Sequence, residues 1–291
     1  MSLPARVSSR KGAARAVATA ADNAPDTLAD ETALPPKKRT KKAAPSSDEL
    51  AKAVASTPPL VLCLSTLDAA CATLGAACPR MALLVAKHGP ATTLLAKSVS
   101  NLGVAIDAPA PDGALASVGA TAPGADPAFT LLAHAIAGQQ LSTKAAATIW
   151  RRLEEALGGA ALFTPSAVLA APVEKLRSAG LSGRKAEYLV TLASAFSTGM
   201  LSSSKLSGMS DDQVVTALTS LRGLGVWSAH MFLIFGLARA DVFPTGDGAI
   251  VKAYQKVYGR TKTAPAELAA AAAAWAPYRS LAAWYLWRSL E

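Results

Sequence analysis

Apolar residues in the second half of the chain recur at intervals of three and four positions, the spacing of one face of an α-helix. Three successive faces of this kind are Phe129, Leu132 and Ile136, then Ile149, Leu153 and Leu157, then Leu189, Ala193 and Phe196. No convincing alternation of apolar and polar positions, the pattern of a half-buried strand, follows residue 127. The pattern from Leu60 to Gly89 predicts two further helices. We therefore predict an all-α chain, in which an antiparallel sheet would fit only upstream of residue 127.

Composition divides the 291 residues into three parts. Residues 1–57 are rich in Ala, Pro, Ser, Thr and Lys and hold no aromatic residue, which predicts a disordered basic tail. Residues 58–126 combine an N-terminal helical part with an insertion rich in Ala, Pro and Gly that carries no motif. Residues 127–291 form the predicted core. Because 51% of the residues are hydrophobic, the chain can bury a sizeable interior.

The predicted tail contains a compact basic run from Pro35 to Lys42, PPKKRTKK. Such a run after prolines resembles a nuclear import signal, and we expect a nuclear protein. A solvated basic arm that adds non-specific DNA affinity is the simpler alternative. The first 21 residues lack acids and carry Arg and Ser, so a mitochondrial or plastid transit peptide is a second alternative.

Two predicted helices meet at a glycine-framed turn. The first runs from Asp211 to Thr219, with Ser210 as its N-cap and acids in its first turn, where the helix dipole favours them. Gly223 and Gly225 flank Leu224, so the backbone is free to take positive φ at both glycines while Leu224 plugs the interior. The second helix leaves from about Val226.

The second helix makes the turn a candidate phosphate site, because the amides of its first turn are unpaired and point back at the turn. The predicted contacts come from Gly223, Leu224, Gly225, Val226 and Ser228. From Trp227 to Leu237 this helix is apolar nearly all round, which predicts that it lies inside a domain.

Two carboxylates lie in the loop that follows. Pro244, Gly246 and Gly248 end the helix, and Asp247 stands at or just before the next helix N-terminus. A carboxylate there is a candidate catalytic group, although an Asp before a helix is also a common N-cap, and one residue can do both. For Asp241 we predict a structural role, capping or pairing with a nearby arginine.

At these residues the chain resembles a known family. LxGxGxWSA from Leu221, followed by DVFPxGD, is similar to the helix-hairpin-helix motif and the Asp loop of the helix-hairpin-helix DNA glycosylases, with the 3-methyladenine branch as the best match. AGQQLS at 137–142, GLSGRKAEYL at 180–189 and PYRSLAAWYLWR at 277–288 agree in order, so the resemblance covers residues 127–291. It implies two helical subdomains with the active-site cleft between them.

The resemblance also implies a function. It points to a base excision repair enzyme that flips alkylated purines, such as 3-methyladenine and 7-methylguanine, out of duplex DNA and hydrolyses the glycosidic bond, with Asp247 as the catalytic residue. Relatives that also cleave the strand carry a lysine where this chain has Trp227. We therefore expect a monofunctional glycosylase that leaves an abasic site. A non-catalytic DNA-binding or damage-sensing module is the alternative.

Further site residues follow from the same resemblance. Gln140 and Leu141 match a wedge that fills the gap left by the flipped base, although Leu141 is also suited to be the first core residue of the next helix. Trp287 matches a pocket tryptophan for a cationic base, and Trp227 either walls this pocket or only packs in the core. Gly248 and Ala249 stand where some relatives carry a bulky residue, a departure from the family pattern that predicts a wider substrate range.

The remaining composition limits partners and cofactors. A net charge of +9 favours a polyanionic partner, and the hairpin favours double-stranded DNA with alkylated bases. His88, His134 and His230 are scattered, and three cysteines are too few for a disulfide framework, so we expect no metal and no cofactor. The resemblance permits a monovalent cation at the hairpin. We expect a monomer without a membrane span, followed by enzymes that process abasic sites.

Overall fold

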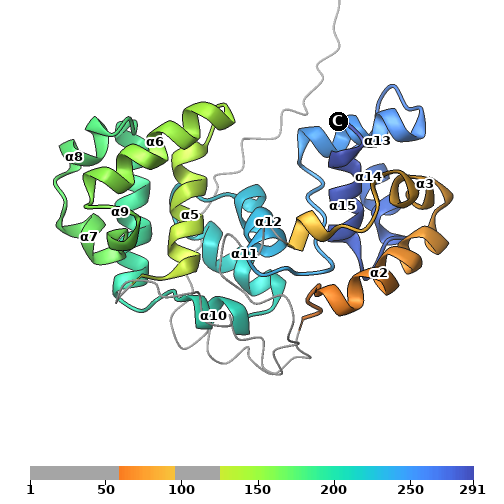
Figure 1. Cartoon of the computed structure of the whole chain (residues 1–291), viewed down its shortest axis with the longest axis horizontal. Helices are drawn as coiled ribbons and strands as arrows, with labels where there is room; N and C mark the ends of the chain where they lie inside the picture. The colour runs from red at the N-terminus through yellow and green to blue at the C-terminus, as the bar shows by residue number, and fades with distance from the viewer. Residues whose placement is uncertain (1–58, 96–124) are drawn as a thin grey trace, which may run out of the picture. The chain divides into compact units, whose positions relative to one another are not determined.

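A computed structural model describes residues 59–95 and 125–291 of the chain, all within one compact unit (Figure 1). The helices follow in the order α2 (Leu64–Ala77), α3 (Pro79–His88), α5 (Pro127–Gly138), α6 (Thr143–Ala156), the 3-10 turn η1 (Ala160–Leu162), α7 (Pro165–Ala170), α8 (Val173–Ser178), α9 (Gly183–Ser197), α10 (Ser203–Gly208), α11 (Asp211–Thr219), α12 (Val226–Phe235), α13 (Gly248–Tyr258), α14 (Pro265–Ala273) and α15 (Arg279–Arg288). Within these two ranges the only strand-like pairing is an isolated bridge between Val61 and Arg239. The predicted all-α fold is confirmed for the described residues.

The helices pack in two groups. The first is continuous in sequence, since α5 packs on α6, α9 and α12, and α12 packs on α11. The second group joins distant parts of the chain, because α3 and α2 from the N-terminal part pack on α15, which also packs on α13. Figure 1 shows the two groups, with α12 in the middle of the described chain. The predicted tail (1–57) and most of the Ala/Pro/Gly-rich insertion lie outside the described residues.

Side-chain caps fix where several helices begin. Ser142, Ser182 and Ser210 each accept a backbone N–H from three residues further on, at the starts of α6, α9 and α11. Ser210 and Gln213 complete a capping box, which satisfies two amides that would otherwise lack partners. Asp126 caps α5 through the amides of Ala128 and Phe129. The predicted Ser210 cap and the bounds of its helix, Asp211–Thr219, are confirmed.

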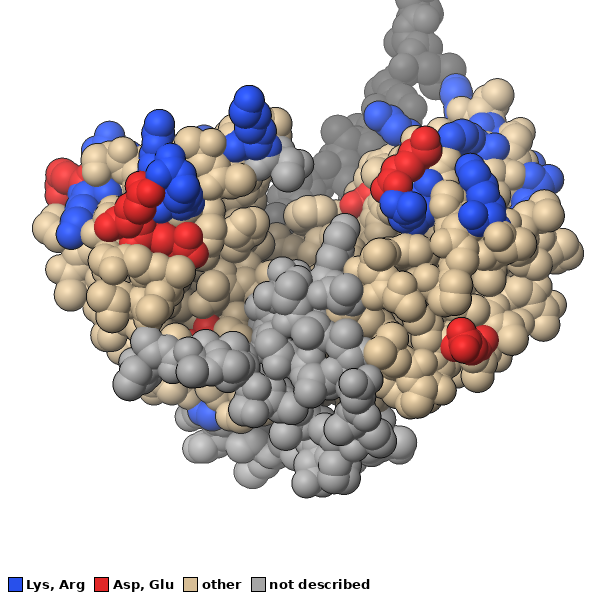
Figure 2. Space-filling view, viewed as in Figure 1, with Lys and Arg blue, Asp and Glu red and all other residues tan. Residues whose placement is uncertain are grey.

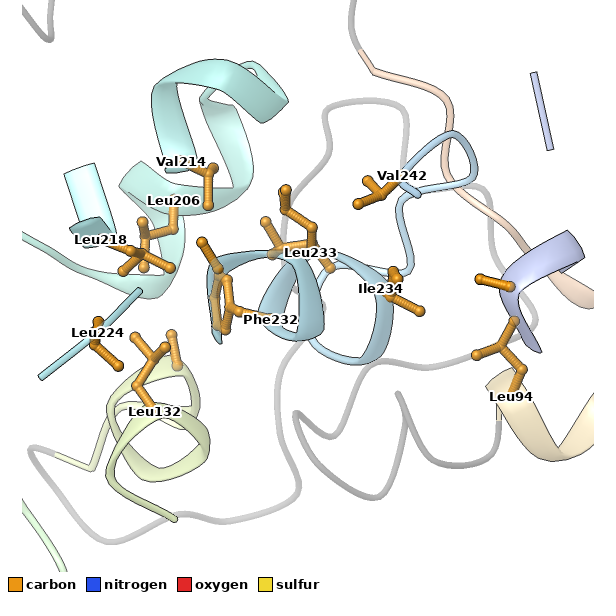
Figure 3. Packing of buried hydrophobic residues seen from close by; sticks show 14 of the residues in the cluster. Leu94, Leu132, Leu206, Val214, Leu218, Leu224, Phe232, Leu233, Ile234 and Val242 are labelled. Atoms are coloured by element: carbon orange, nitrogen blue, oxygen red, sulfur yellow. The ribbon is translucent and has the colours of Figure 1, made fainter. Parts of the chain in front are cut away.

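Buried side chains of α5, α11 and the turn before α12 pack against α12. Phe232 of α12 points toward Leu218 of α11 and Leu132 of α5, and Leu224 of the preceding turn lies close to both (Figure 3). All four side chains are buried, as are the apolar residues predicted for the inner faces of α5 and α9. Close packing of this kind fixes the direction of α12 and therefore the place of its N-terminal turn.

The prediction that the helix from Trp227 to Leu237 lies inside a domain is wrong at its first turn. Val226 is 54% exposed and Trp227 is 50% exposed, whereas Phe232, Leu233 and Ile234 are buried. The physical reason is that the preceding hairpin reaches the surface, so the helix enters the interior only after its first turn. Hydrophobic periodicity describes the faces of a helix and says nothing about its ends.

Polar contacts join the two helix groups along residues 238–242. The Leu62 amide donates to the Ala238 carbonyl, and the Ala240 amide donates to the Leu60 carbonyl. On the other side, the Ser280 hydroxyl accepts the Val242 amide at 2.9 Å. The segment that leads from α12 to Asp247 is thereby held by both ends of the described chain. None of the helices in residues 59–95 and 125–291 has the length and apolar character needed to cross a bilayer.

Candidate functional site

The turn between α11 and α12 depends on one glycine for its conformation. Gly223 has φ of 97°, and a Cβ at this position would lie 2.3 Å from Cγ of Tyr188, so the residue needs both the left-handed backbone and the missing side chain. Gly225 differs from the prediction, because its φ of −108° is extended. It serves as the N-cap of α12, whose first amides have no side-chain acceptor. This turn therefore offers amides to an anion without using a second left-handed residue.

The other predicted contacts of the hairpin take different places. Leu224 is buried and Val226 is exposed, so the turn is anchored from inside while α12 begins at the surface. Ser228 is buried and faces a cavity of about 270 Å³ between α5 and α12. Met231, Phe235 and Leu131 line the same cavity. The sequence did not single out these three residues, because each also fits an ordinary core position.

Asp247 is the N-cap of α13 and is 8% exposed. Its Oδ1 accepts the amides of Ala249 and Ile250 at 2.8 and 2.9 Å. These two bonds confirm the prediction that Asp247 is a cap. They also fix the direction of the carboxylate, because both amides belong to the rigid first turn of the helix.

Two indoles complete the surroundings of this carboxylate. Trp227 Nε1 donates to Oδ2 of Asp247 at 2.6 Å, and Trp287 Nε1 donates to Oδ1 at 3.3 Å. The two tryptophans come from α12 and α15, so one residue from each helix group holds the same side chain. Within the described residues, no lysine or arginine forms an ion pair with Asp247. The structure thus brings together three of the predicted site residues around one buried anion.

Aromatic rings connect Asp247 to the cavity. Trp287 stacks on Phe235 with 5.7 Å between ring centroids, and Phe235 lines the cavity between α5 and α12. Trp227 and Trp287 are not themselves lining residues of that cavity. Trp227, whose indole nitrogen contacts the carboxylate, is half exposed as a residue. This arrangement places a π surface and an anion side by side, which suits a ligand that carries positive charge.

Asp241, the other carboxylate of the loop, forms the predicted pair with an arginine. Arg279 donates from Nε and Nη2 to the two carboxylate oxygens at 2.7 and 2.8 Å. The hydrogen bonds to Asp241 raise the pKa of Arg279, because they favour its charged form. The Arg279 amide also donates to Asp241 Oδ1, so the carboxylate helps to hold the start of α15. Its role is structural, as the sequence indicated.

The predicted wedge lies in the turn between α5 and α6. Leu141 is 39% exposed, so the alternative that it is the first core residue of the next helix is wrong. Gln140 is exposed and has φ of 57°, an uncommon backbone for a residue with a side chain. Gln139 Nε2 donates to the Gly223 carbonyl at 2.7 Å, which joins this turn to the hairpin.

The surroundings of the site contain basic side chains and single histidines. In the view of Figure 2, lysine and arginine side chains gather along the upper edge, over α6 and over α13. In residues 59–95 and 125–291 no three His, Cys, Asp or Glu side chains form a group suited to hold a metal ion. Burial lowers the pKa of His230 on α12, because it disfavours the charged imidazolium.

Known proteins resemble this chain over the same region. A family model described as HhH-GPD superfamily base excision DNA repair protein matches residues 133–277. DNA-3-methyladenine glycosylase 1 of Schizosaccharomyces pombe is 32% identical over 161 residues, which are 54% of this chain and 70% of that protein.

Two solved structures are similar as well. The S. pombe 3-methyladenine DNA glycosylase Mag1 in complex with abasic DNA has a TM-score of 0.57 and 26% identity, over 76% of this chain and 95% of that one. A DNA-3-methyladenine glycosidase from Bacillus halodurans has a TM-score of 0.53 and 31% identity, over 73% of this chain and 89% of that one.

Proposed function

Because this chain belongs to the HhH-GPD superfamily of base excision DNA repair proteins, we propose that it is a DNA glycosylase that excises alkylated purines from double-stranded DNA. The observation that carries the proposal is Asp247, a buried carboxylate held only by neutral N–H donors among the described residues. Family membership supplies the reaction class, and the carboxylate supplies the group that this reaction needs.

Asp247 stabilises positive charge on the sugar. Cleavage of the bond between base and deoxyribose builds oxocarbenium character at the sugar carbon, and a nearby anion lowers the energy of that transition state. An arginine partner would neutralise the carboxylate beforehand, as Arg279 does for Asp241. The two backbone amides and two indoles instead fix the carboxylate and leave its charge available. A water molecule, oriented by the carboxylate, then attacks the sugar carbon from which the base has departed and completes the hydrolysis.

The base side of the site fits an alkylated purine. Methylation at N3 or N7 gives the base a positive charge, which both improves it as a leaving group and attracts it to aromatic faces. Trp227 is half exposed beside Asp247, and the stacked pair of Phe235 and Trp287 leads to the cavity between α5 and α12. We assign Trp227 and Trp287 to the base pocket, with Gly248 and Ala249 leaving room for more than one adduct.

DNA contacts are proposed for the hairpin and the wedge. The uncapped amides at the start of α12 receive a phosphate of the strand that holds the lesion, and the family resemblance permits a monovalent cation at the same turn. Gln140 and Leu141 enter the duplex where the base leaves. We further propose that the protein acts as a monomer, that enzymes which process abasic sites follow it, and that the basic run of the tail directs it to the nucleus.

The enzyme is proposed to be monofunctional. A glycosylase that cleaves the strand needs an amine that attacks the sugar carbon and forms a Schiff base. Trp227 occupies the position at which such relatives carry lysine, and its indole nitrogen is engaged with Asp247. The test is borohydride treatment during turnover on methylated duplex DNA, which traps a Schiff base covalently. We expect abasic product without a trapped complex, and a trapped complex would refute monofunctional action.

The central test is release of free 3-methyladenine or 7-methylguanine from methylated duplex DNA. Wild-type protein is expected to release base, Asp247→Asn to lose nearly all release while it still binds DNA, and Asp241→Asn to remain active. If wild type binds DNA and releases no base above background, the chain is a binding module and the glycosylase proposal fails.

A further inference from the structure

The turn at residues 138–141 is held by a lysine that lies far away in sequence. Lys185 Nζ donates to the Ala137 carbonyl at 2.9 Å and to the Gln139 carbonyl at 2.7 Å. Both acceptors lie at the C-terminal end of α5, where carbonyls lack helical partners and a cation is favoured. The ammonium therefore closes the end of α5 and fixes the first part of the turn.

The position of Lys185 is unfavourable for its own helix. It stands in the first turn of α9, whose N-terminal end disfavours a positive charge. Burial also lowers the pKa of Lys185, which means that the surroundings disfavour its charged form. The Lys185 ammonium is not needed to cap α9, because Ser182 already caps this helix. The two carbonyls of the turn are the interactions that this ammonium gains in the described structure.

The side chain of Gln139 joins the same part of the turn to the hairpin. Its Nε2 donates to the carbonyl of Gly223, the residue whose positive φ shapes the turn between α11 and α12. The two surface turns are thus joined directly rather than through the core. After Gln139 the chain passes through Gln140, which has a left-handed conformation, and Leu141 is exposed. The exposed Leu141 therefore lies two positions after Gln139, the residue at which both contacts meet.

We propose that Lys185 and Gln139 are positioning residues that hold the 138–141 turn so that Leu141 enters the base stack when the hairpin grips the strand. The inference rests on the proposed glycosylase function, because only base extrusion needs a wedge at this place. The Lys185 ammonium then binds two carbonyls of the protein and does not bind a phosphate. Gln139 keeps the wedge and the hairpin at one fixed separation, so that binding of the strand places the wedge at the flipped nucleotide.

The test separates extrusion of the base from cleavage of its bond. One duplex carries 7-methylguanine paired with cytosine beside a 2-aminopurine reporter, and a second carries the same lesion in a mismatched bubble, where little stacking or pairing must be overcome. Single-turnover excision and the reporter fluorescence are measured for Lys185→Ala and Gln139→Ala. For Lys185→Ala we expect excision and extrusion on the paired duplex to fall at least about tenfold, as for loss of hydrogen bonds from a charged group. For Gln139→Ala, which loses one neutral hydrogen bond, we expect a fall of about fivefold. Excision in the bubble should change less than about twofold in both variants.

Two further variants control for charge and folding. Lys185→Arg retains donors for both carbonyls and should restore most of the paired-duplex rate. Lys205→Ala removes the same charge and a similar lysine bond to a backbone carbonyl, that of Gly199, away from the hairpin, and should behave as wild type. Thermal unfolding checks that each variant folds.

Each other outcome counts against one specific statement. Equal losses on the paired duplex and in the bubble would overturn the positioning role, because the residues would then act on the chemistry or on the fold. Unchanged excision in Lys185→Ala and Gln139→Ala would overturn it as well. If wild type releases base from neither duplex, the proposed function itself fails and this inference falls with it.

Discussion

Asp241 and Asp247 lie in the same loop between α12 and α13, yet their side chains accept hydrogen bonds from different kinds of donor. Asp241 receives both arms of the Arg279 guanidinium. Asp247 receives two backbone amides and two indoles, all of them neutral. Asp241 is about one third exposed, with 29% of its side chain accessible, whereas Asp247 is 8% exposed as a residue. The more buried carboxylate is therefore the one without a cationic partner in the described chain.

The difference shows how a loop assigns two roles to one residue type. Burial of a carboxylate without a partner charge is costly, and hydrogen bonds to neutral donors offset part of this cost. For Asp241 the guanidinium removes the cost, and the pair joins the loop to α15. For Asp247 the four neutral donors stabilise the carboxylate but leave its net charge, which a positive group stabilises further. A sugar that gains oxocarbenium character is such a group, so the ground state of the free protein bears a cost that the transition state relieves.

The largest expected effect comes from removal of the unpaired charge. Asp247→Asn should lower single-turnover excision of 7-methylguanine by about 10²–10³-fold, the size of loss seen when one group that stabilises transition-state charge is removed. Asparagine is also a good N-cap, so α13 and the unfolding free energy should change little. The matched variant Asp241→Asn should change excision by less than about threefold. Equal losses of excision in both variants would show that the missing cationic partner of Asp247 does not matter for catalysis.

A smaller effect is expected from the indole that holds Asp247 most closely. Trp227→Phe keeps an aromatic ring but loses the N–H that donates to Oδ2 at 2.6 Å. We expect kcat to fall about tenfold, as for one hydrogen bond to a charged group, while KM stays within about twofold. Trp287→Phe, which loses a longer bond of 3.3 Å, should cost less. A rise in KM without a fall in kcat would assign Trp227 to base binding alone.

Local sequence patterns predicted the parts of this site that depend on local chemistry. Ser210 and Asp247 are caps because a short polar side chain before a helix meets free amides, whatever surrounds it. The bounds of α11 and the start of α12 followed from the glycines and the apolar spacing. The pairing of Asp241 with an arginine followed from its place before a buried segment, although the sequence did not say which arginine.

Contacts between distant residues could not be read in this way. Gln139 and Gly223 are 84 residues apart, and Lys185 and Gln139 are 46 apart, so no local pattern marks either hydrogen bond. The bond from Trp227 to Asp247 was missed because an apolar helix predicts burial, and the half-exposed first turn of α12 follows from where the hairpin reaches the surface. Gly225 was assigned positive φ by composition, but an extended N-cap satisfies the turn equally well.

The third expected effect concerns stability and tests the role of Asp241 directly. Asp241→Asn leaves Arg279 without its anionic partner, and both side chains are partly exposed, so solvent screens much of the interaction. We expect the unfolding free energy to fall by about 1 kcal/mol. Urea unfolding followed by circular dichroism measures this loss. If Asp241→Asn had the unfolding free energy of wild type while Asp247→Asn lost more than about 1 kcal/mol, the assignment of structural and chemical roles would be reversed.

The smallest expected effect is a pH dependence of the unfolding free energy that comes from His230 and not from the two carboxylates. Burial lowers the pKa of His230 on α12 below its usual 6.5, so the folded protein favours the neutral imidazole. The stability from this group is therefore fully present above about pH 6.5 and is lost as the pH falls through the lowered pKa of the folded state. His230 shares α12 with Trp227, so a loss of stability in this helix on acidification would also lower excision. His230→Gln should flatten the pH dependence of the unfolding free energy in this range, and any acid limb of the excision profile that remains in this variant belongs to another group. If His230→Gln and wild type show the same dependence of stability on pH, burial of His230 does not contribute to it.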